Sequence, residues 1–234
     1  TGKYYAEGGG RPLGTILYGT VPDRVVATEP ELNNLAQSLG SPALPLIAVG
    51  VHHDDIENGT GVFQHKLVRE GRGNIHWMVL TTGADLTGVL DEQIEGHETL
   101  PLEELVNRKI KLRQGETAAA AGVLGLPAEN LTFFKFGAGS RKEDFEVTMG
   151  KAQEEEFIGR LKEIAKDLPD EDPIAIAWNT PIDPRRAHSY SAGFVESAVK
   201  KFVEETGRPV YALRFRLLKD SEDVEEPNLS LFMS

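Results

Sequence analysis

An apolar run that ends at Val51 is followed directly by four polar residues: His52, His53, Asp54 and Asp55. Packing gives no reason to place two imidazoles and two carboxylates together, because like charges repel and a carboxylate is costly to remove from water. A divalent metal ion would resolve the conflict, since it binds neutral imidazole and ionised carboxylate at short range. The alternative is a helix N-terminus, where the two aspartates would suit the positive end of the dipole.

The chain around this motif alternates between strand and helix patterns. Apolar runs predict strands near residues 44–51, 74–81, 131–136, 174–178 and 209–217. Amphipathic periodicity predicts helices near residues 59–70, 102–124, 151–168 and 188–205. Apolar strands separated by amphipathic helices predict an α/β fold of the Rossmann-like, doubly wound kind, with a mainly parallel sheet covered by helices on both faces.

This fold class predicts where the chemistry lies, because ligands in open α/β sheets bind beyond the carboxyl ends of the strands. The motif follows the first of these strands, and the loop after the fourth strand leads to His188 at the start of the last helix. His52, Asp55 and His188 could therefore meet at one end of the sheet. Two ligands three residues apart and a distant third leave one coordination position open, which is typical of catalytic zinc sites.

Three segments are expected along the chain. Residues 44–218 form the α/β domain, and residues 1–43 form an N-terminal extension packed on it. Residues 219–234 begin acidic and end apolar, which favours a tail that docks on its own chain or on a neighbouring subunit of a homo-oligomer. Two long surface loops, residues 85–99 and 137–150, are the expected walls of a substrate pocket.

Composition excludes several classes of partner. The 234 residues carry a formal net charge of −12 and no dense run of Lys and Arg, so neither nucleic acid nor an anionic membrane surface is an expected partner. The absence of cysteine excludes disulfides and thiolate ligands, so a metal here would be held by nitrogen and oxygen. With no apolar stretch long enough for a membrane span and no visible secretory signal, we expect a cytoplasmic protein.

Residues 49–80, VGVHHDDIENGTGVFQHKLVREGRGNIHWMVL, resemble the opening of the LmbE-like, or PIG-L, family of zinc-dependent N-deacetylases. The family signature is His-Pro-Asp-Asp-x-Glu after the first strand, followed by a helix and a second strand. A second family block, Arg-x-x-Glu before an alanine-rich helix, is similar to residues 113–125. The third block, His-x-Asp-His before the final helix, aligns with residues 185–188, and the resemblance covers roughly residues 44–205.

The resemblance implies a role for each matching residue. His52, Asp55 and His188 match the ligands of one Zn²⁺ per chain, although another divalent metal could bind the same set. Asp54 matches the general base that takes a proton from metal-bound water. Glu57 matches an acidic residue that orients a ligand or closes the turn, with an exposed position on the helix as the alternative.

Three positions that depart from the family pattern concern this chain's own chemistry. His53 replaces the family's proline and is expected to be a turn residue that points away, with an additional group in the pocket as the alternative. Arg185 replaces a histidine that stabilises the tetrahedral intermediate, and Ala187 replaces an aspartate. The Arg185 guanidinium could stabilise an oxyanion but could not deliver a proton at neutral pH. The alternative is a shifted alignment, in which Arg185 is a surface or substrate-binding cation.

Two further residues are candidates for binding substrate. Arg113 matches the second family block, and the alternative is a simple ion pair with Glu116 on the same helix. Trp178 ends a predicted strand, where its ring could be a platform for a sugar or part of the core.

The function that these residues predict is zinc-dependent hydrolysis of the acetamide of an N-acetylglucosamine-type sugar or a small glycoconjugate. The partner is then a small N-acetylated molecule. A non-catalytic metal-binding α/β protein, and another metal-dependent amide or ester hydrolase, are the alternatives. The eukaryotic glycolipid-processing members of the family carry a membrane anchor, and its absence from this sequence favours a soluble substrate.

Overall fold

The computed structural model describes residues 4–5, 12–13, 15–18, 24–26, 44–69, 71, 74–84, 89–137, 149–179 and 186–215. Their strands are β1 (Tyr4–Tyr5), β2 (Pro12–Leu13), β3 (Thr15–Tyr18), β4 (Arg24–Val26), β5 (Leu46–Gly50), β6 (Ile75–Val79), β7 (Leu131–Phe133), β8 (Ile174–Asn179) and β9 (Val210–Phe215). The helices are α2 (Asp55–Arg69), α3 (Val89–Glu92), α4 (Leu102–Val123), α6 (Lys151–Ala165) and α7 (Arg186–Thr206), with short 3-10 helices η1 (His97–Thr99) and η2 (Ala128–Asn130).

Seven strands form one sheet in the order β4-β3-β9-β8-β5-β6-β7. The five strands from β9 to β7 are parallel, and β3 and β4 extend the β9 edge in antiparallel pairing. Because the chain proceeds from β5 outward to β6 and β7 and then returns to β8 and β9, the strand order reverses between β5 and β8. This reversal is a topological switch point, the place where ligands bind in doubly wound sheets.

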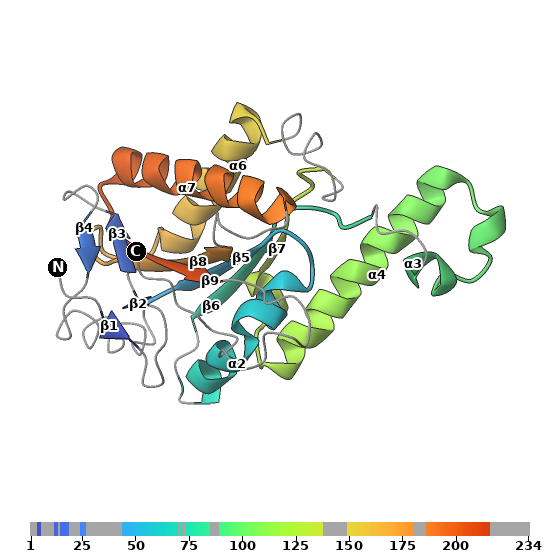
Figure 1. Ribbon diagram of the computed structural model, residues 1–234, viewed down its shortest axis with the longest axis horizontal. Helices are drawn as coiled ribbons and strands as arrows, with labels where there is room; N and C mark the ends of the chain where they lie inside the picture. Colours follow the sequence, from blue (N-terminus) through green and yellow to red (C-terminus); the bar gives the residue numbers. More distant parts are fainter. Residues whose placement is uncertain are drawn as a thin grey trace.

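Helices cover both faces of the parallel strands, as Figure 1 shows. Side chains alternate along β5, so that Ile47 and Val49 join the cluster under α6 and α7 while Leu46 and Ala48 join the cluster under α2 and α4. The central strands are buried along their whole length. Burial on both faces explains why these strands have continuous apolar sequences, and it confirms the predicted fold class.

Helix α2 begins earlier than the predicted start near residue 59. Its first residue is Asp55, and the carbonyl of Asp54 already accepts a helical hydrogen bond from the Asn58 N–H at 3.1 Å. The glycines at positions 59 and 61 therefore lie inside the helix. The Thr60 hydroxyl donates to the Ile56 carbonyl at 2.7 Å, which satisfies this polar side chain within the helix.

The segment expected as a long loop before α4 is partly helical. It contains α3 and η1, and Figure 1 shows α3 (green) at the far end of α4, away from the sheet. The buried Lys109 ammonium pairs there with the Asp91 carboxylate, which ties α3 to α4. Within the described residues, no helix is both long enough and apolar enough to cross a bilayer.

Candidate metal centre

The turn after β5 is pressed against the end of its own strand. A Cβ atom added to Gly50 would lie 2.8 Å from Ile56 Cγ1 and 3.0 Å from the His52 carbonyl oxygen, so only glycine allows this approach. From the neighbouring strand end, the Thr81 N–H and hydroxyl donate to the Val51 carbonyl at 3.0 and 2.7 Å. These contacts fix the backbone that carries His52 and Asp55 at the carboxyl end of β5.

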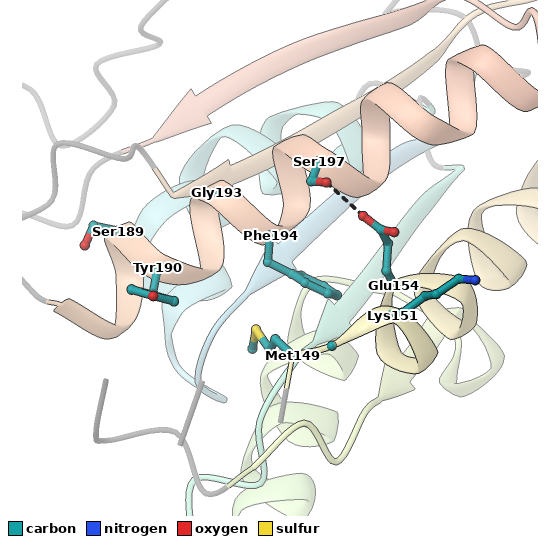
Figure 2. Close-up of a pocket in the computed structure, with 9 residues that line it drawn as sticks. Met149, Lys151, Glu154, Ser189, Tyr190, Gly193, Phe194 and Ser197 are labelled. Carbon is teal, nitrogen blue, oxygen red and sulfur yellow. Dashed lines mark hydrogen bonds between the residues drawn. The ribbon is translucent and has the colours of Figure 1, made fainter. Parts of the chain in front are cut away.

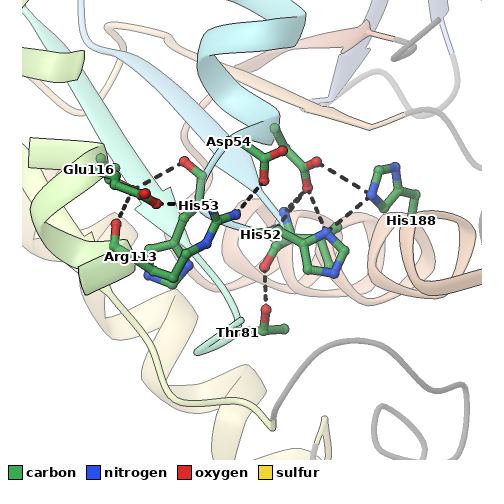
Figure 3. Close-up of polar contacts among 10 residues, drawn as sticks. His52, His53, Asp54, Thr81, Arg113, Glu116 and His188 are labelled. Carbon is green, nitrogen blue, oxygen red and sulfur yellow. Dashed lines mark hydrogen bonds and ion pairs between the residues drawn. The ribbon is translucent and has the colours of Figure 1, made fainter. Parts of the chain in front are cut away.

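The three predicted ligands come together at this position, and Figure 3 shows two of them, His52 and His188, side by side. His188 Nε2 lies 3.3 Å from His52 Nδ1 and 3.4 Å from an Asp55 carboxylate oxygen, and His52 Nδ1 lies 3.4 Å from the other oxygen. One ligand atom from each residue lies within 4.8 Å of the others. The trio joins the end of β5 to the start of α7, across the switch point between β5 and β8.

The environment of Asp55 suits a ligand that binds as an anion. Its carboxylate is 3% exposed and accepts the backbone N–H groups of Val51 and His52 at 3.0 and 2.8 Å. Burial alone would raise the pKa of Asp55, but the hydrogen bond and charge of His52, together with His188, outweigh burial and lower the pKa. Two imidazoles and an ionised carboxylate form a donor set that fits zinc or a similar divalent metal.

Asp54 faces a different partner from its neighbour. Arg113, on α4, donates from Nη2 to Asp54 Oδ1 at 2.8 Å and from Nη1 to Glu116 Oε2 at 2.9 Å. The Arg113 side chain is 13% exposed, whereas the Asp54 side chain is 48% exposed. Asp54 thus keeps solvent access next to the candidate metal-binding trio, while Arg113 on α4 restrains its carboxylate.

The alternative interpretation of the motif, a charged helix N-terminus, describes the backbone correctly. Asp55 opens α2, but its carboxylate turns back to the N–H groups of Val51 and His52. The Asp54 carboxylate meets Arg113. The motif is therefore a helix start whose acidic side chains contact groups outside the helix that they begin.

His53 points away from the three ligands, as expected, but it is buried. Its ring stacks on Phe133 with centroids 5.7 Å apart, and the missing side chain of Gly83 leaves room beside Nδ1. Burial, followed by the nearby charge of Arg113, lowers the pKa of His53 to about 4. The Thr117 hydroxyl donates to the His53 carbonyl at 3.1 Å, so α4 holds both the backbone of the motif and the Asp54 carboxylate.

The remaining candidate residues have different surroundings. Glu57 is half-buried in the first turn of α2, and burial together with the Asp54 charge raises its pKa. Trp178 is 1% exposed within the core, with the Arg214 guanidinium 5.5 Å from its ring centre. This position favours the core alternative for Trp178 over a sugar platform. Arg185 lies outside the described residues.

Three residues that contact the ligand turn or His188 do not belong to any of the motifs that predicted the site. Thr81 and Thr117 bind the backbone carbonyls of the ligand turn, and Asn179 lies beside His188 with Nδ2 3.5 Å from the imidazole Nδ1. Thr81 and Asn179 share one signal in the sequence, since both stand at or just after the carboxyl end of an apolar strand. Thr117 carries no such signal, because it lies inside the helix α4.

A groove of about 610 Å³ lies between α6 and α7, as Figure 2 shows. Tyr190 and Phe194 line it from α7, and Met149 lines it from the segment just before α6. Met149 also packs against the cluster formed by Val51 and Ala187, the residues that directly precede His52 and His188. Met149 therefore contacts both the groove and the two residues that precede His52 and His188.

Comparisons with known proteins leave the family open, because no family model and no curated protein matches the chain. One similar solved structure is the conserved protein TT1542 from Thermus thermophilus, with 20% identity, a TM-score of 0.45, and coverage of 67% of this chain and 55% of that one. Another is GalB, the 4-carboxy-2-hydroxymuconate hydratase from Pseudomonas putida, with 16% identity, a TM-score of 0.47, and coverage of 66% and 55%. The chain spans about half the length of both, and similarity at this level carries no conclusion about activity.

Proposed function

We propose that this protein is a zinc-dependent N-deacetylase of the LmbE-like, or PIG-L, kind. The observation that carries the proposal is the convergence of His52, Asp55 and His188 at the switch point of the sheet, with Asp54 beside them. The resemblance in sequence assigns these same four positions to the ligands and the base of that family. An acetamide of an amino sugar or small glycoconjugate is the proposed substrate.

Asp54 is the residue proposed to move protons. When bound, zinc would lower the pKa of a water molecule and polarise the amide carbonyl. Asp54 would take one proton from the attacking water and deliver it to the leaving nitrogen as the C–N bond breaks, which yields the amine and acetic acid, and the acid then releases its proton to solvent as acetate forms. The exposed side of Asp54 gives it access to both groups, and Arg113 restrains its carboxylate during the transfer.

The groove between α6 and α7 is the proposed site for the part of the substrate beyond the acetamide. Tyr190 is 36% exposed and offers an aromatic face, which suits a sugar ring. In the same groove Glu154 accepts a hydrogen bond from Ser197 at 2.8 Å, so polar groups are also available to sugar hydroxyls. Arg185 is proposed to stabilise the oxyanion, as its alignment with the family histidine suggests.

The test combines metal analysis with amine release from a panel of N-acetylglucosaminyl compounds. We expect about one zinc per chain and release of a primary amine. Asp54→Asn should retain zinc while amine release falls by roughly 10²–10⁴-fold, because the amide cannot accept the proton. The matched control is Glu116→Gln, which removes a carboxylate on the other side of Arg113.

Each arm of this test has a contrary result. A wild-type protein without bound metal would remove the basis of the proposal. Bound zinc without amine release from any compound would instead favour a metal-binding α/β protein that does not hydrolyse acetamides. Full activity of Asp54→Asn would assign the proton transfer to another residue.

A further inference from the structure

Asn179 is a buried amide at the carboxyl end of β8 whose two polar atoms have unequal surroundings. The residue is 2% exposed, and its backbone is fixed by pairing with Phe215 in β9. Its Nδ2 lies 3.5 Å from Nδ1 of His188, whereas its Oδ1 is buried without a hydrogen-bond partner among the described residues. A buried carbonyl oxygen without a partner is costly, so this oxygen needs a donor.

The neighbouring imidazole can supply that donor. Nε2 of His188 faces the other two ligands, at 3.3 Å from His52 and 3.4 Å from Asp55, so Nε2 is the ring nitrogen available to a metal. A nitrogen that binds a metal carries no proton, and a neutral imidazole then holds its proton on the other nitrogen. With a metal on Nε2, the N–H of His188 would therefore lie at Nδ1, on the side of Asn179.

We propose that Asn179 is a positioning residue that accepts a hydrogen bond from His188 Nδ1–H when the metal is bound. A half-turn of the amide about its last torsion exchanges Nδ2 for Oδ1 and pairs the buried oxygen with the ring N–H. This proposal rests on the proposed metal site and adds to it a residue that orients one of the ligands.

The same chain contains a second Asn–His pair that serves as a reference. His76 Nε2 lies 2.9 Å from Asn74 Oδ1, so this imidazole donates to an asparagine oxygen from Nε2. The pair lies at the amino end of β6, whereas Asn179 lies at the carboxyl end of β8 with the metal centre. The same substitution can therefore be made at Asn74, away from the candidate ligands, as a control for the substitution at Asn179.

The test measures zinc affinity and the protonation of the ring nitrogens, with zinc alone as the probe and no substrate. Asn179→Asp keeps an acceptor oxygen and loses the NH₂ donor, so zinc affinity should stay within about threefold of wild type or increase. Asn179→Leu loses the acceptor, and zinc affinity should fall by roughly 10–100-fold. Asn74→Asp, the matched control, should leave zinc affinity unchanged.

Long-range ¹H–¹⁵N spectra of the zinc-loaded wild type report the proton on each imidazole nitrogen. A purely structural role for Asn179 would not change how fast the His188 Nδ1–H proton exchanges. We expect a slowly exchanging Nδ1–H on His188, and fast exchange of the same proton in Asn179→Leu. A tenfold or greater loss of affinity in Asn179→Asp would overturn the proposal, since it would show that Asn179 acts through its NH₂ group.

If Asn179→Leu does not fold, the wild-type spectrum and the zinc affinity of Asn179→Asp still test whether Asn179 accepts a hydrogen bond from His188. Wild-type affinity in a folded Asn179→Leu would overturn the role of Asn179 and leave the deacetylase proposal intact. Failure of deacetylation with these zinc affinities as expected would overturn the deacetylase proposal alone.

Discussion

Asp54 and Asp55 are adjacent and chemically identical, yet their surroundings differ in ways that suit different tasks. Asp55 is buried, its contacts with His52 and His188 lower its pKa, and two backbone N–H groups fix its carboxylate in place. Asp54 is half-exposed, and its carboxylate meets the tip of the Arg113 side chain. A fixed carboxylate suits a metal ligand, and an accessible one suits proton transfer.

Arg113→Lys tests whether the arginine orients Asp54. The guanidinium reaches Asp54 and Glu116 with separate Nη atoms, which a lysine ammonium cannot reproduce. We expect kcat/KM for amine release to fall roughly tenfold to a hundredfold while zinc content stays the same, because the guanidinium binds these two carboxylates rather than a metal ligand. Steady-state kinetics with metal analysis would check this, and unchanged kinetics would show that Asp54 needs no such restraint.

His76→Gln tests the pH dependence of stability away from the metal centre. Burial and the Arg160 charge lower the pKa of His76 to about 4 from its usual 6.5. Between these pH values the unfolded chain binds a proton at His76 that the folded protein does not. The contribution of His76 to the free energy of unfolding is therefore fully present above pH 6.5 and is lost as the pH falls toward 4.

The variant should therefore lose less stability on acidification than wild type. Allowing for partial exposure, we expect the loss of unfolding free energy between about pH 7.5 and pH 5 to shrink by about 1 kcal/mol. Urea denaturation of the metal-free protein at the two pH values measures it. His65→Gln, which removes an exposed imidazole from α2, is the control. An equal pH dependence in His76→Gln and wild type would contradict the prediction.

At the scale of elements, the metal centre depends on how closely α2 approaches the end of β5. Gly50→Ala would place a Cβ atom 2.8 Å from Ile56 Cγ1 and 3.3 Å from Asp55 Cβ, so the turn would have to move. We expect a loss of about 1–3 kcal/mol in unfolding free energy and weaker zinc binding.

Gly61→Ala is the matched control for Gly50→Ala. Its new Cβ would lie 3.9 Å from Glu57 Cβ, which is an ordinary contact inside a helix. Because alanine favours helix more than glycine does, this variant should be neutral or about 0.5–1 kcal/mol more stable. Chemical denaturation and zinc titration of both variants give the comparison, and equal effects would show that the turn tolerates displacement.

At the scale of the whole molecule, the three candidate ligands connect segments that are far apart in the chain. His52 and His188 are separated by 136 positions and come from opposite sides of the strand-order reversal. A metal that binds only the folded arrangement therefore stabilises the whole α/β domain. Zinc at about one hundred times its Kd should raise the free energy of unfolding by about 2.7 kcal/mol.

Thermal and chemical unfolding with and without a chelator would measure this stabilisation. His188→Ala should abolish the zinc-dependent increase, whereas His65→Ala, a change on the exposed face of α2, should preserve it. A zinc-dependent increase that persists in His188→Ala would place the metal elsewhere.

Local patterns in the sequence determined the elements and the fold class. Apolar runs and helical periodicity depend only on neighbouring residues, so the positions of β5, β6, β8, α4 and α7 could be predicted closely. Element boundaries were less certain, as α2 shows: its start at Asp55 depends on contacts of that carboxylate with the preceding backbone. The four polar residues after β5 were visible in the sequence for the same local reason.

Only the tertiary structure decided how these residues share the site. Strand order brings His188 to His52 and Asp55, and the packing of α4 gives Asp54 its arginine. The same packing buries His53 on Phe133, while that of α7 and β9 encloses Trp178 in the core. These outcomes depend on which side chains meet across the sheet and between helices, and such contacts join positions whose separation in sequence carries no local signal.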